Sequence, residues 1–257
     1  EYGYFPGCVD FMDVEVKFTH LNKGDADHAS IAAASIKLLN YADIDPLILD
    51  MNVFKCSGHD QLWQGQLEVF DALKEHNLRR LKESGIKIIT CSCAECYRTF
   101  AVDYDLPNTL GIKVEHITQT LQGRGLKFKA PEDVTVAYHD PCRLGRMMGE
   151  YEAPRDLIQL VDGAKIVELE NNKERALCCG VSSMMYCNDA TKAVRRKRLD
   201  QGTDAGIDIM LGGCPKCYMH MQCMLNEERM NPEEGHHHDY EMMDLMQFLV
   251  ACLEEKS

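Results

Sequence analysis

The sequence predicts an α/β fold built from two similar cysteine-rich halves, each with a short parallel sheet. Two observations lead to this prediction: strand-like and helix-like segments alternate along the chain, and the first half recurs imperfectly in the second. Strands that alternate with helices of about ten or more residues form parallel sheets. We therefore expect an internal duplication, in which one supersecondary unit occurs twice.

The individual elements follow from apolar spacing and from glycine and proline positions. Residues 28–41, 62–84, 153–161 and 182–201 are predicted helices, and residues 47–49, 86–90, 134–138, 166–169 and 207–211 are predicted strands. Gly85 should end the second helix as a C-cap glycine. Residues 240–253 have apolar positions at helical spacing and predict a last helix that packs on the second half.

The repeat is clearest around two CxxC motifs, CAEC at 93–96 and CPKC at 214–217. One fixed offset relates Ile86 and Tyr97 of the first half to Ile207 and Tyr218 of the second. FPGC at 5–8 corresponds to HDPC at 139–142, and KCSG at 55–58 corresponds to CCG at 178–180. The repeat predicts one domain at residues 1–128 and a second at residues 129–257.

Charge and hydropathy exclude two classes of partner. The 257 residues include 28 basic and 41 acidic side chains, for a net charge of −13, which argues against nucleic-acid binding. The one basic run, 195–198, is expected to be the solvated face of a helix. No window reaches the ~18 apolar residues of a membrane-spanning helix, so we expect no membrane span.

Thirteen cysteines, an odd number, favour metal binding over disulfides. The chain opens without a signal peptide, so we expect a reducing, anoxic cytoplasm, with contact to a membrane through a partner subunit as an option. Because the sequence starts at Glu1 and not at a methionine, a processed start and a missing upstream segment are both open alternatives.

The strongest candidate site lies in the second half. Five cysteines fall in three short clusters, each beside proline or glycine, and follow predicted strands whose carboxyl ends share one sheet edge. Thiolates gathered in this way favour zinc or iron–sulfur over hard cations. Five exceed the four that tetrahedral zinc accepts, which indicates a cluster. The candidate ligands are Cys142, Cys178, Cys179, Cys214 and Cys217.

The first half has a weaker version of this set. Its candidate ligands are Cys8, Cys56, Cys93 and Cys96, and Ser57 stands where the second half has Cys179. Four cysteines suffice for a cubane [4Fe–4S] cluster, which is the preferred interpretation. A five-ligand site completed by Ser57 or by Cys91, and loss of the cluster, are the alternatives.

Other residues near the motifs are weaker candidates. Cys187, Cys223 and Cys252 are expected to be small buried side chains. His139, Arg143 and Arg146 flank Cys142, where they are candidates to tune a cluster, to bind a substrate anion or to make structural hydrogen bonds. The histidines at 236–238 are expected to form a solvated loop.

The motifs HDPCRLGR at 139–146, CCG at 178–180 and CPKCY at 214–218, supported by FPGC and CAECYRTF, resemble the cysteine-rich (CCG) domain found in the B and D subunits of heterodisulfide reductase. The resemblance covers nearly the whole chain. It implies a noncubane [4Fe–4S] cluster on the five second-half cysteines, and a second [4Fe–4S] cluster, cubane or noncubane, in the first half. Ser57 departs from the family's five-cysteine motif in that half.

The resemblance implies an iron–sulfur oxidoreductase subunit that reduces or forms a thiol disulfide. In such an enzyme, Arg143 or Arg146 is a candidate to hold an anionic substrate. It also implies a small thiol or disulfide substrate and partners that include a ferredoxin-like iron–sulfur subunit, because the chain has no ferredoxin motif. Relatives with degenerate first halves serve lactate and glycolate oxidation, a sulfite-reducing membrane complex and an unusual succinate dehydrogenase. A non-catalytic electron-relay subunit is therefore the alternative, and a structural zinc protein is the third option.

Overall fold

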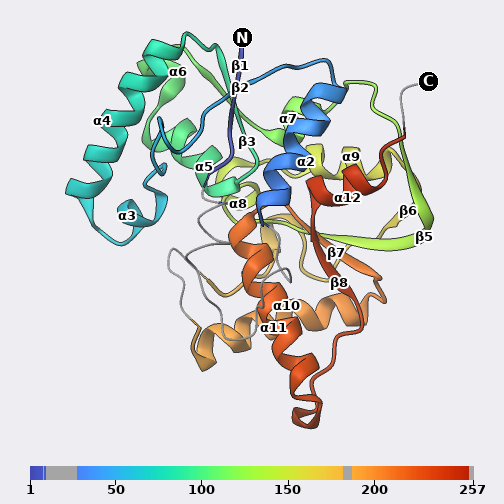
Figure 1. Ribbon diagram of the computed structural model, residues 1–257. Coiled ribbons are helices and arrows are strands. Elements are labelled where there is room, and N and C mark those ends of the chain that lie inside the picture. The colour runs from blue at the N-terminus through green and yellow to red at the C-terminus, as the bar shows by residue number, and fades with distance from the viewer. Residues whose placement is uncertain (8, 10–27, 182–186, 255–257) are drawn as a thin grey trace.

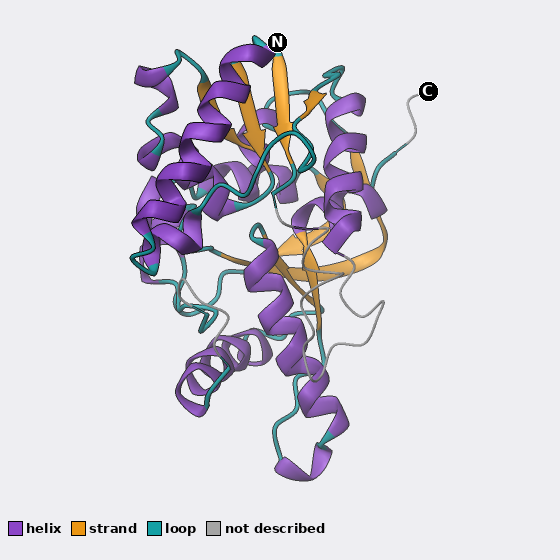
Figure 2. Ribbon diagram, turned by 60° about the vertical axis from the view of Figure 1, so that its left-hand side comes forward, coloured by secondary structure: helices purple, strands orange, loops and turns teal. Residues whose placement is uncertain are grey.

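The computed structural model describes residues 1–7, 9, 28–181 and 187–254. They form an α/β structure with two four-stranded sheets, in which neighbouring strands are parallel. Figure 1 follows the chain from one sheet to the other, and Figure 2 shows the two groups of strands as separate sheets joined by helices. The predicted fold class is confirmed.

The first sheet has the strand order β2-β1-β3-β4. Its strands are β1 (Tyr2–Phe5), β2 (Leu47–Ile48), β3 (Ile88–Cys91) and β4 (Lys113–His116). The helices of this half are α2 (His28–Tyr41), α3 (His59–Trp63), α4 (Leu67–Ser84), α5 (Ala94–Arg98), α6 (Leu106–Thr109) and α7 (Ile117–Leu121), with a π-helical turn at Thr99–Asp103.

The second sheet has the order β6-β5-β7-β8, which is the same arrangement. Its strands are β5 (Phe128–His139), β6 (Val161–Ile166), β7 (Ile209–Gly212) and β8 (Glu241–Asp244). The helices are α8 (Gly145–Met148), α9 (Glu152–Gln159), α10 (Asp189–Asp204), α11 (Pro215–Met230) and α12 (Leu245–Ala251), with 3₁₀ turns at Lys173–Arg175 and Pro232–Glu234.

The duplication extends to the local hydrogen bonds that begin helices. The last strand of each sheet passes directly into a helix through a capping box, in which the N-cap side chain and the N3 side chain each accept from the backbone. His116 and Gln119 form this box at α7, and Asp244 and Gln247 form it at α12. Such a box satisfies backbone donors that a helix start leaves open, so both halves fix the strand–helix turn in the same way.

Helices α2, α7, α9 and α12 pack against one another between the two sheets. They share a buried core with residues of β1 and β5, such as Tyr4 and Val136. Leucines supply much of it, and burying each fully contributes about 1.5–3 kcal/mol; those on these helices are Leu38, Leu39, Leu121, Leu157, Leu245 and Leu249. A second buried cluster contains cysteines of both motif sets.

Most predicted helices are present, with shifted bounds. α2 covers the predicted residues 28–41, and Gly85 ends α4 in the left-handed conformation. The predicted helix 62–84 is two helices, because Gly65 between them has a φ of +78°. In the region predicted as helix 182–201, α10 spans Asp189–Asp204, and residues 182–186 lie outside the described residues.

Two predictions in the second half are wrong in part. The predicted strand 166–169 lies at Val161–Ile166, where it pairs with β5. The predicted helix 240–253 starts as strand β8, and only Leu245–Ala251 is helical. Met242 and Met243 fit a helical apolar pattern, but pairing of Met210 with Met242 along β7 selects the strand. Tertiary pairing overrides the local pattern here.

Candidate metal centre

The five cysteines predicted in the second half line one small cavity. They come from three segments: the loop after β5, the loop before α10 and the first turn of α11. Loops that follow parallel strands meet at the carboxyl edge of a sheet, which is how segments far apart in sequence converge. The lining cysteines are Cys142, Cys178, Cys179, Cys214 and Cys217, beside Glu95, Arg143 and Lys216.

The thiols of this set contact one another in a continuous row. The Cys217 thiol lies 3.1 Å from the Sγ of Cys179. Hydrogen bonds link Cys179 to Cys178, and Cys178 to Cys142. At the other end of the row, Cys217 is hydrogen-bonded to Cys214. All five predicted second-half ligands are therefore brought together.

A glycine shapes the cysteine loop of each half at the same place. Gly58 and Gly180 have φ values of +80° and +77°. Their backbone N–H groups lie 3.5 and 3.4 Å from the sulfurs of Cys56 and Cys178, two residues earlier. A Cβ atom at position 180 would lie 2.3 Å from the carbonyl oxygen of Thr191. Only glycine fits this turn, and the turn directs an N–H donor at the sulfur.

The first-half set repeats part of the geometry. Cys93 is the N-cap of α5, and it is hydrogen-bonded to Cys96 in the first turn. The hydroxyl of Ser57 donates to the Sγ of Cys96 at 3.5 Å. Ser57 is therefore placed beside Cys96 as Cys179 is placed beside Cys217, although Ser57 donates and Cys179 accepts. Its side chain is buried, as a position facing the motif should be.

Of two further candidate cysteines in the first half, Cys8 and Cys91, the structure describes only the second. Cys8 lies outside the described residues. A Cβ atom on Gly7, just before it, would lie 3.4 Å from the Sγ of Cys96, so the chain passes beside the motif there. Cys91 is fully buried at the end of β3, in register with Phe5 and His116. Burial and the nearby Cys96 raise the pKa of its thiol.

The two cysteine sets meet at a thiol contact between Cys93 and Cys214. Beside this contact, the buried Lys216 ammonium lies 2.6 Å from a carboxylate oxygen of Asp60 and 2.9 Å from one of Glu95. Burial raises the pKa of Glu95 to about 8, and Lys216 opposes that rise. The sequence did not predict this ion pair. The available signal was opposite charge at the third position of each CxxC motif.

The basic run at 195–198 is only in part the solvated face that was predicted: Lys197 is exposed and Arg196 is half-buried. Arg195 and Arg198 are completely buried, and they bond to residues of the cysteine site. Arg195 donates to the carbonyl oxygen of Cys179 at 3.1 Å and to Nδ1 of His220 at 3.1 Å. Arg198 donates to Nδ1 of His139 at 3.0 Å. Hydrogen bonds to carbonyl and imidazole acceptors explain how two cations are buried.

Arg143 forms one wall of the cysteine cavity. Its guanidinium lies 3.9 Å above the ring of Trp63, which is 40% exposed. It donates to Nε2 of His59 at 3.2 Å and to the thioether of Met147 at 3.2 Å. Burial lowers the pKa of His59 to about 3, and Arg143 adds to that effect. Because these partners are neutral, they leave the positive charge of Arg143 available to bind an anion.

Arg146 has a structural role in the same region. It donates to the backbone carbonyls of Glu174 and Ala176, just before the CCG loop. Both bonds hold the segment that leads to Cys178. Of the two arginines that the sequence offered as anion contacts, Arg143 is the one that lines the cavity.

The remaining cysteines divide by burial. Cys223 and Cys252 are buried, as predicted, whereas Cys187 is exposed. An Nη1 group of Arg195 lies 3.8 Å from the sulfur of Cys187. His238, predicted to be in a solvated loop, is buried and bonded to Glu228 at 2.5 Å. His238 is buried because it bonds to Glu228 of α11 and Asp200 of α10, whereas His236 and His237 are exposed, as predicted.

Comparison with known families identifies the chain. The sequence profile of the cysteine-rich domain (CCG) matches residues 2–101 and 136–222, one match in each half. The chain belongs to the CCG family. The two matches agree with the duplicated sheets, and both CCG repeats contain a CxxC motif at the start of a helix.

Several curated relatives of this CCG chain are redox proteins. The D subunit of the dihydromethanophenazine:CoB–CoM heterodisulfide reductase of Methanosarcina barkeri is 32% identical over 79% of this chain and 52% of that protein. A probable iron–sulfur-binding oxidoreductase of Bacillus subtilis is 29% identical over 76% of this chain and 28% of that protein. The B subunit of a fumarate reductase (CoM/CoB) of Methanothermobacter marburgensis is 27% identical over 96% and 45%. The chain spans about half the length of the Methanosarcina relative.

One solved structure, an aspartate racemase of Picrophilus torridus, covers 97% of this chain at 10% identity with a TM-score of 0.37. That likeness is too weak to carry an argument about the CCG chain.

The donor set of the second CCG repeat fits an iron–sulfur cluster. Hydrogen bonding to Cys178 and burial raise the pKa of the Cys142 thiol, and contact with Cys179 raises that of Cys217. Hydrogen bonds from Cys217 and Cys93 lower the pKa of Cys214. Deprotonated thiols packed this closely would repel one another unless a bound metal takes the place of the lost protons. Five soft donors in one row suit a cluster better than a four-coordinate ion.

Proposed function

We propose that this chain is an iron–sulfur oxidoreductase subunit that reduces or forms a thiol disulfide at a noncubane [4Fe–4S] cluster. The cluster would be held by Cys142, Cys178, Cys179, Cys214 and Cys217. The single observation that carries the proposal is the unbroken row of these five thiols along one cavity. Heterodisulfide reductases among the relatives supply the reaction class.

We propose a second [4Fe–4S] cluster, of the cubane type, on Cys8, Cys56, Cys93 and Cys96. The hydroxyl of Ser57 donates to the sulfur of Cys96, which supports a hydrogen-bonding role for Ser57 rather than a place among the ligands. The contact between Cys93 and Cys214 supports electron transfer between the two halves. The change of sheet between β4 and β5 supports domains at 1–128 and 129–257.

When bound, the second-half cluster supplies one-electron chemistry at a sulfur-binding iron, so that one-electron carriers serve a two-electron disulfide couple. The protein's own residues bind and orient the substrate. Arg143 offers a cation at the cavity wall, stacked on Trp63, where it would hold an anionic group of a thiol. Lys216 is neutralised by Asp60 and Glu95, so it joins the halves and does not compete for that anion.

Mössbauer and EPR spectroscopy on anaerobically purified protein test the cofactor. Iron and acid-labile sulfide are counted on the same sample, and a small thiol is then added. We expect a noncubane signal that shifts with thiol. Cubane signals that do not respond to thiol would support the relay alternative, and zinc without sulfide would refute both.

Replacement of Arg143 tests the substrate class. In R143Q, we expect binding of mercaptoacetate, measured by the shift of the cluster signal, to weaken by about tenfold, because a charge-assisted hydrogen bond is lost. Binding of cysteamine, a thiol without an anionic group, should not weaken. Equal loss for both thiols would show that Arg143 acts on the fold and not on the substrate charge.

The alternative function is a non-catalytic electron relay in a larger complex. Ser57 at the fifth ligand position favours it, and so do relatives with other reactions, such as an EtfAB:quinone oxidoreductase of Syntrophomonas wolfei. For either function we propose a ferredoxin-like iron–sulfur subunit and further subunits as partners, in a cytoplasmic complex that contacts a membrane through a partner. Among the described residues, no helix is long and apolar enough to cross a bilayer.

A further inference from the structure

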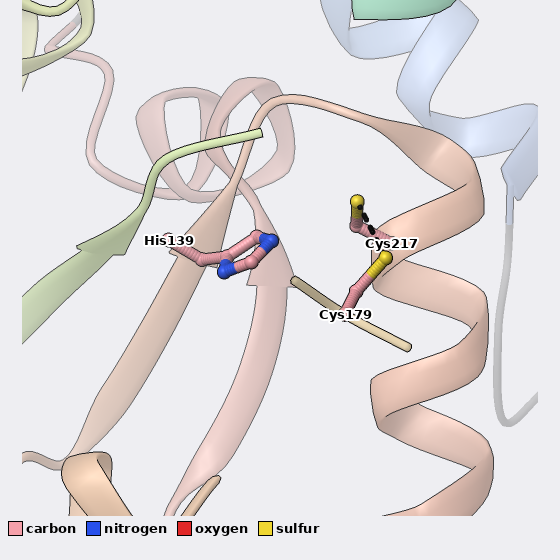
Figure 3. Close-up of side chains that lie close together, drawn as sticks. All are labelled: His139, Cys179 and Cys217. Atoms are coloured by element: carbon pink, nitrogen blue, oxygen red, sulfur yellow. Dashed lines mark hydrogen bonds between the residues drawn. The ribbon is translucent and has the colours of Figure 1, made fainter. Parts of the chain in front are cut away.

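His139 is held between a buried arginine and the cysteine row. It ends β5, is fully buried and immediately precedes the loop that carries Cys142. On one side, Nε of Arg198 donates to its Nδ1 at 3.0 Å. On the other side, a ring nitrogen of His139 and the sulfurs of Cys179 and Cys217 all lie within 4.8 Å of one another. Figure 3 shows the imidazole reaching toward the two sulfurs.

The contact with Arg198 determines where the proton of His139 lies. A guanidinium carries only donors, so Nδ1 must be the acceptor in this pair. A neutral imidazole has one N–H, which must then be on Nε2. Because Nδ1 accepts from Arg198, the fully buried ring holds a single proton and is neutral. Arg198 is itself anchored by the carbonyl of Asn171 at 2.6 Å and by Gln201 at 2.9 Å.

The Nε2–H group has no hydrogen-bond acceptor in the part of the chain that the structure describes. Its nitrogen is buried and without a hydrogen-bond partner there. A buried donor left unsatisfied is unfavourable, and such a group in a native structure calls for an acceptor. The sulfurs of Cys179 and Cys217, which lie within 4.8 Å of a ring nitrogen of His139, are the candidate acceptors for this group.

We propose that His139 is a positioning residue whose Nε2–H donates to sulfur of the second-half cluster and raises its reduction potential. The inference rests on the proposed cluster at this site. A hydrogen bond to sulfur stabilises the more negative, reduced form. Arg198 fixes the imidazole tautomer from the far side, as outer partners do for histidines near metals.

The same geometry argues against His139 as a ligand. Its position beside Cys179 and Cys217 is close enough for a shared metal ion. Coordination needs a lone pair, however, and the lone pair of Nδ1 is occupied by Arg198 while Nε2 carries the proton. His139 therefore differs from the cysteines in role, although it shares their site.

The decisive experiment is a redox titration of the cluster by EPR in native protein, H139L and H139Q. We expect H139L to keep its iron and sulfide but to lower the equilibrium constant for one-electron reduction by about tenfold, a midpoint potential about 59 mV more negative. H139Q should restore most of the potential, because its amide offers an N–H at a similar reach. H238Q, at a buried histidine bonded to Glu228 and Asp200, is the matched control and should not move it.

Pulsed EPR on native protein labelled with ¹⁵N-histidine keeps the proposal testable if H139L does not fold. We expect a weakly coupled histidine nitrogen and a proton that exchanges in D₂O. A strongly coupled nitrogen, or iron loss in H139L, would make His139 a ligand and overturn the proposal. An unchanged potential in H139L with intact iron would overturn it as well, while leaving the cluster itself in place. Native protein without iron and sulfide would instead refute the proposed cluster.

Discussion

The two halves share a scaffold and differ in what surrounds the cysteines. Sheet order, the glycine turn and the capping box at the last strand recur in both. In the second half, the cysteine loop is held by the cation of Arg195, which donates to the carbonyl of Cys179. In the first half, the neutral amide of Asn77 donates to the carbonyl of Cys56 at 3.2 Å.

The residues that end β1 and β5, the corresponding strands of the two sheets, also differ in polarity. His139, at the end of β5, is bonded to Arg198. Phe5, at the end of β1, instead packs edge-on against Phe100, with ring centroids 4.9 Å apart. One site is lined by buried cations and a polar ring, and the other by aromatic rings. The comparison teaches that the duplicated backbone positions sulfur, whereas the neighbouring side chains set the charge that a bound group can carry.

The largest expected effect comes from making the second half resemble the first. C179S puts serine where the first half has Ser57 and interrupts the sulfur row at its 3.1 Å contact with Cys217. We expect the second-half cluster to convert or to be lost, with about half of the iron gone if it is lost, while the first-half signal stays. Iron and sulfide counts with EPR provide the measurement.

The reciprocal variant, S57C, adds the missing fifth thiol beside Cys96. If the scaffold alone decides cluster type, its first-half signal should change toward the noncubane form. A C179S protein with unchanged iron and spectrum would show that the ligand assignment is wrong.

The second largest effect is expected at the ion pair that joins the two halves, where a substitution should lower the free energy of unfolding. The side chain of Lys216 is 4% exposed and pairs with Asp60 and Glu95 across the junction. K216M leaves the buried Glu95 without its cation. Because the pKa of Glu95 is already raised to about 8, its carboxyl takes up a proton, and we expect a loss of about 1–3 kcal/mol in free energy of unfolding. Urea denaturation measures it. K173M is the control, because Lys173 and Glu152 form an exposed pair at 2.6 Å and should lose little.

The sequence predicted the repeat and the second-half cysteine set because both depend on local motifs. CxxC follows a strand and begins a helix in each half, and glycine is required at position 180. The sequence did not predict the burial of Arg195 and Arg198. Their acceptors, the Cys179 carbonyl and His139, come from distant segments, and charge runs alone favour solvent.

A smaller effect on the free energy of unfolding, which depends on pH, is expected in the second half, where His238 packs against α11. His238 is bonded to Glu228 and Asp200; burial opposes its charged form, but these carboxylates prevail and raise its pKa. Its stabilisation should be complete below the unfolded pKa of about 6.5 and lost as pH rises through the higher folded pKa.

Urea unfolding of native protein and H238Q at about pH 5.5 and about pH 9 measures this contribution. The difference in free energy of unfolding should be larger at the lower pH. A difference that grows with pH would mean that His238 is neutral in the folded protein.

The smallest effect is expected at Cys187, which has no cysteine counterpart in the first half. Its side chain is exposed, and Nη1 of Arg195 approaches its sulfur at 3.8 Å. Arg195 keeps its stronger bonds to the Cys179 carbonyl and to His220 without that sulfur. C187A should therefore retain the iron, the sulfide and the midpoint potential of the cluster, whereas C179S should convert or lose the cluster. Loss of iron in C187A would show that Cys187 is a sixth ligand of the second-half site. The two halves would then differ in the number of their ligands as well as in the side chains around them.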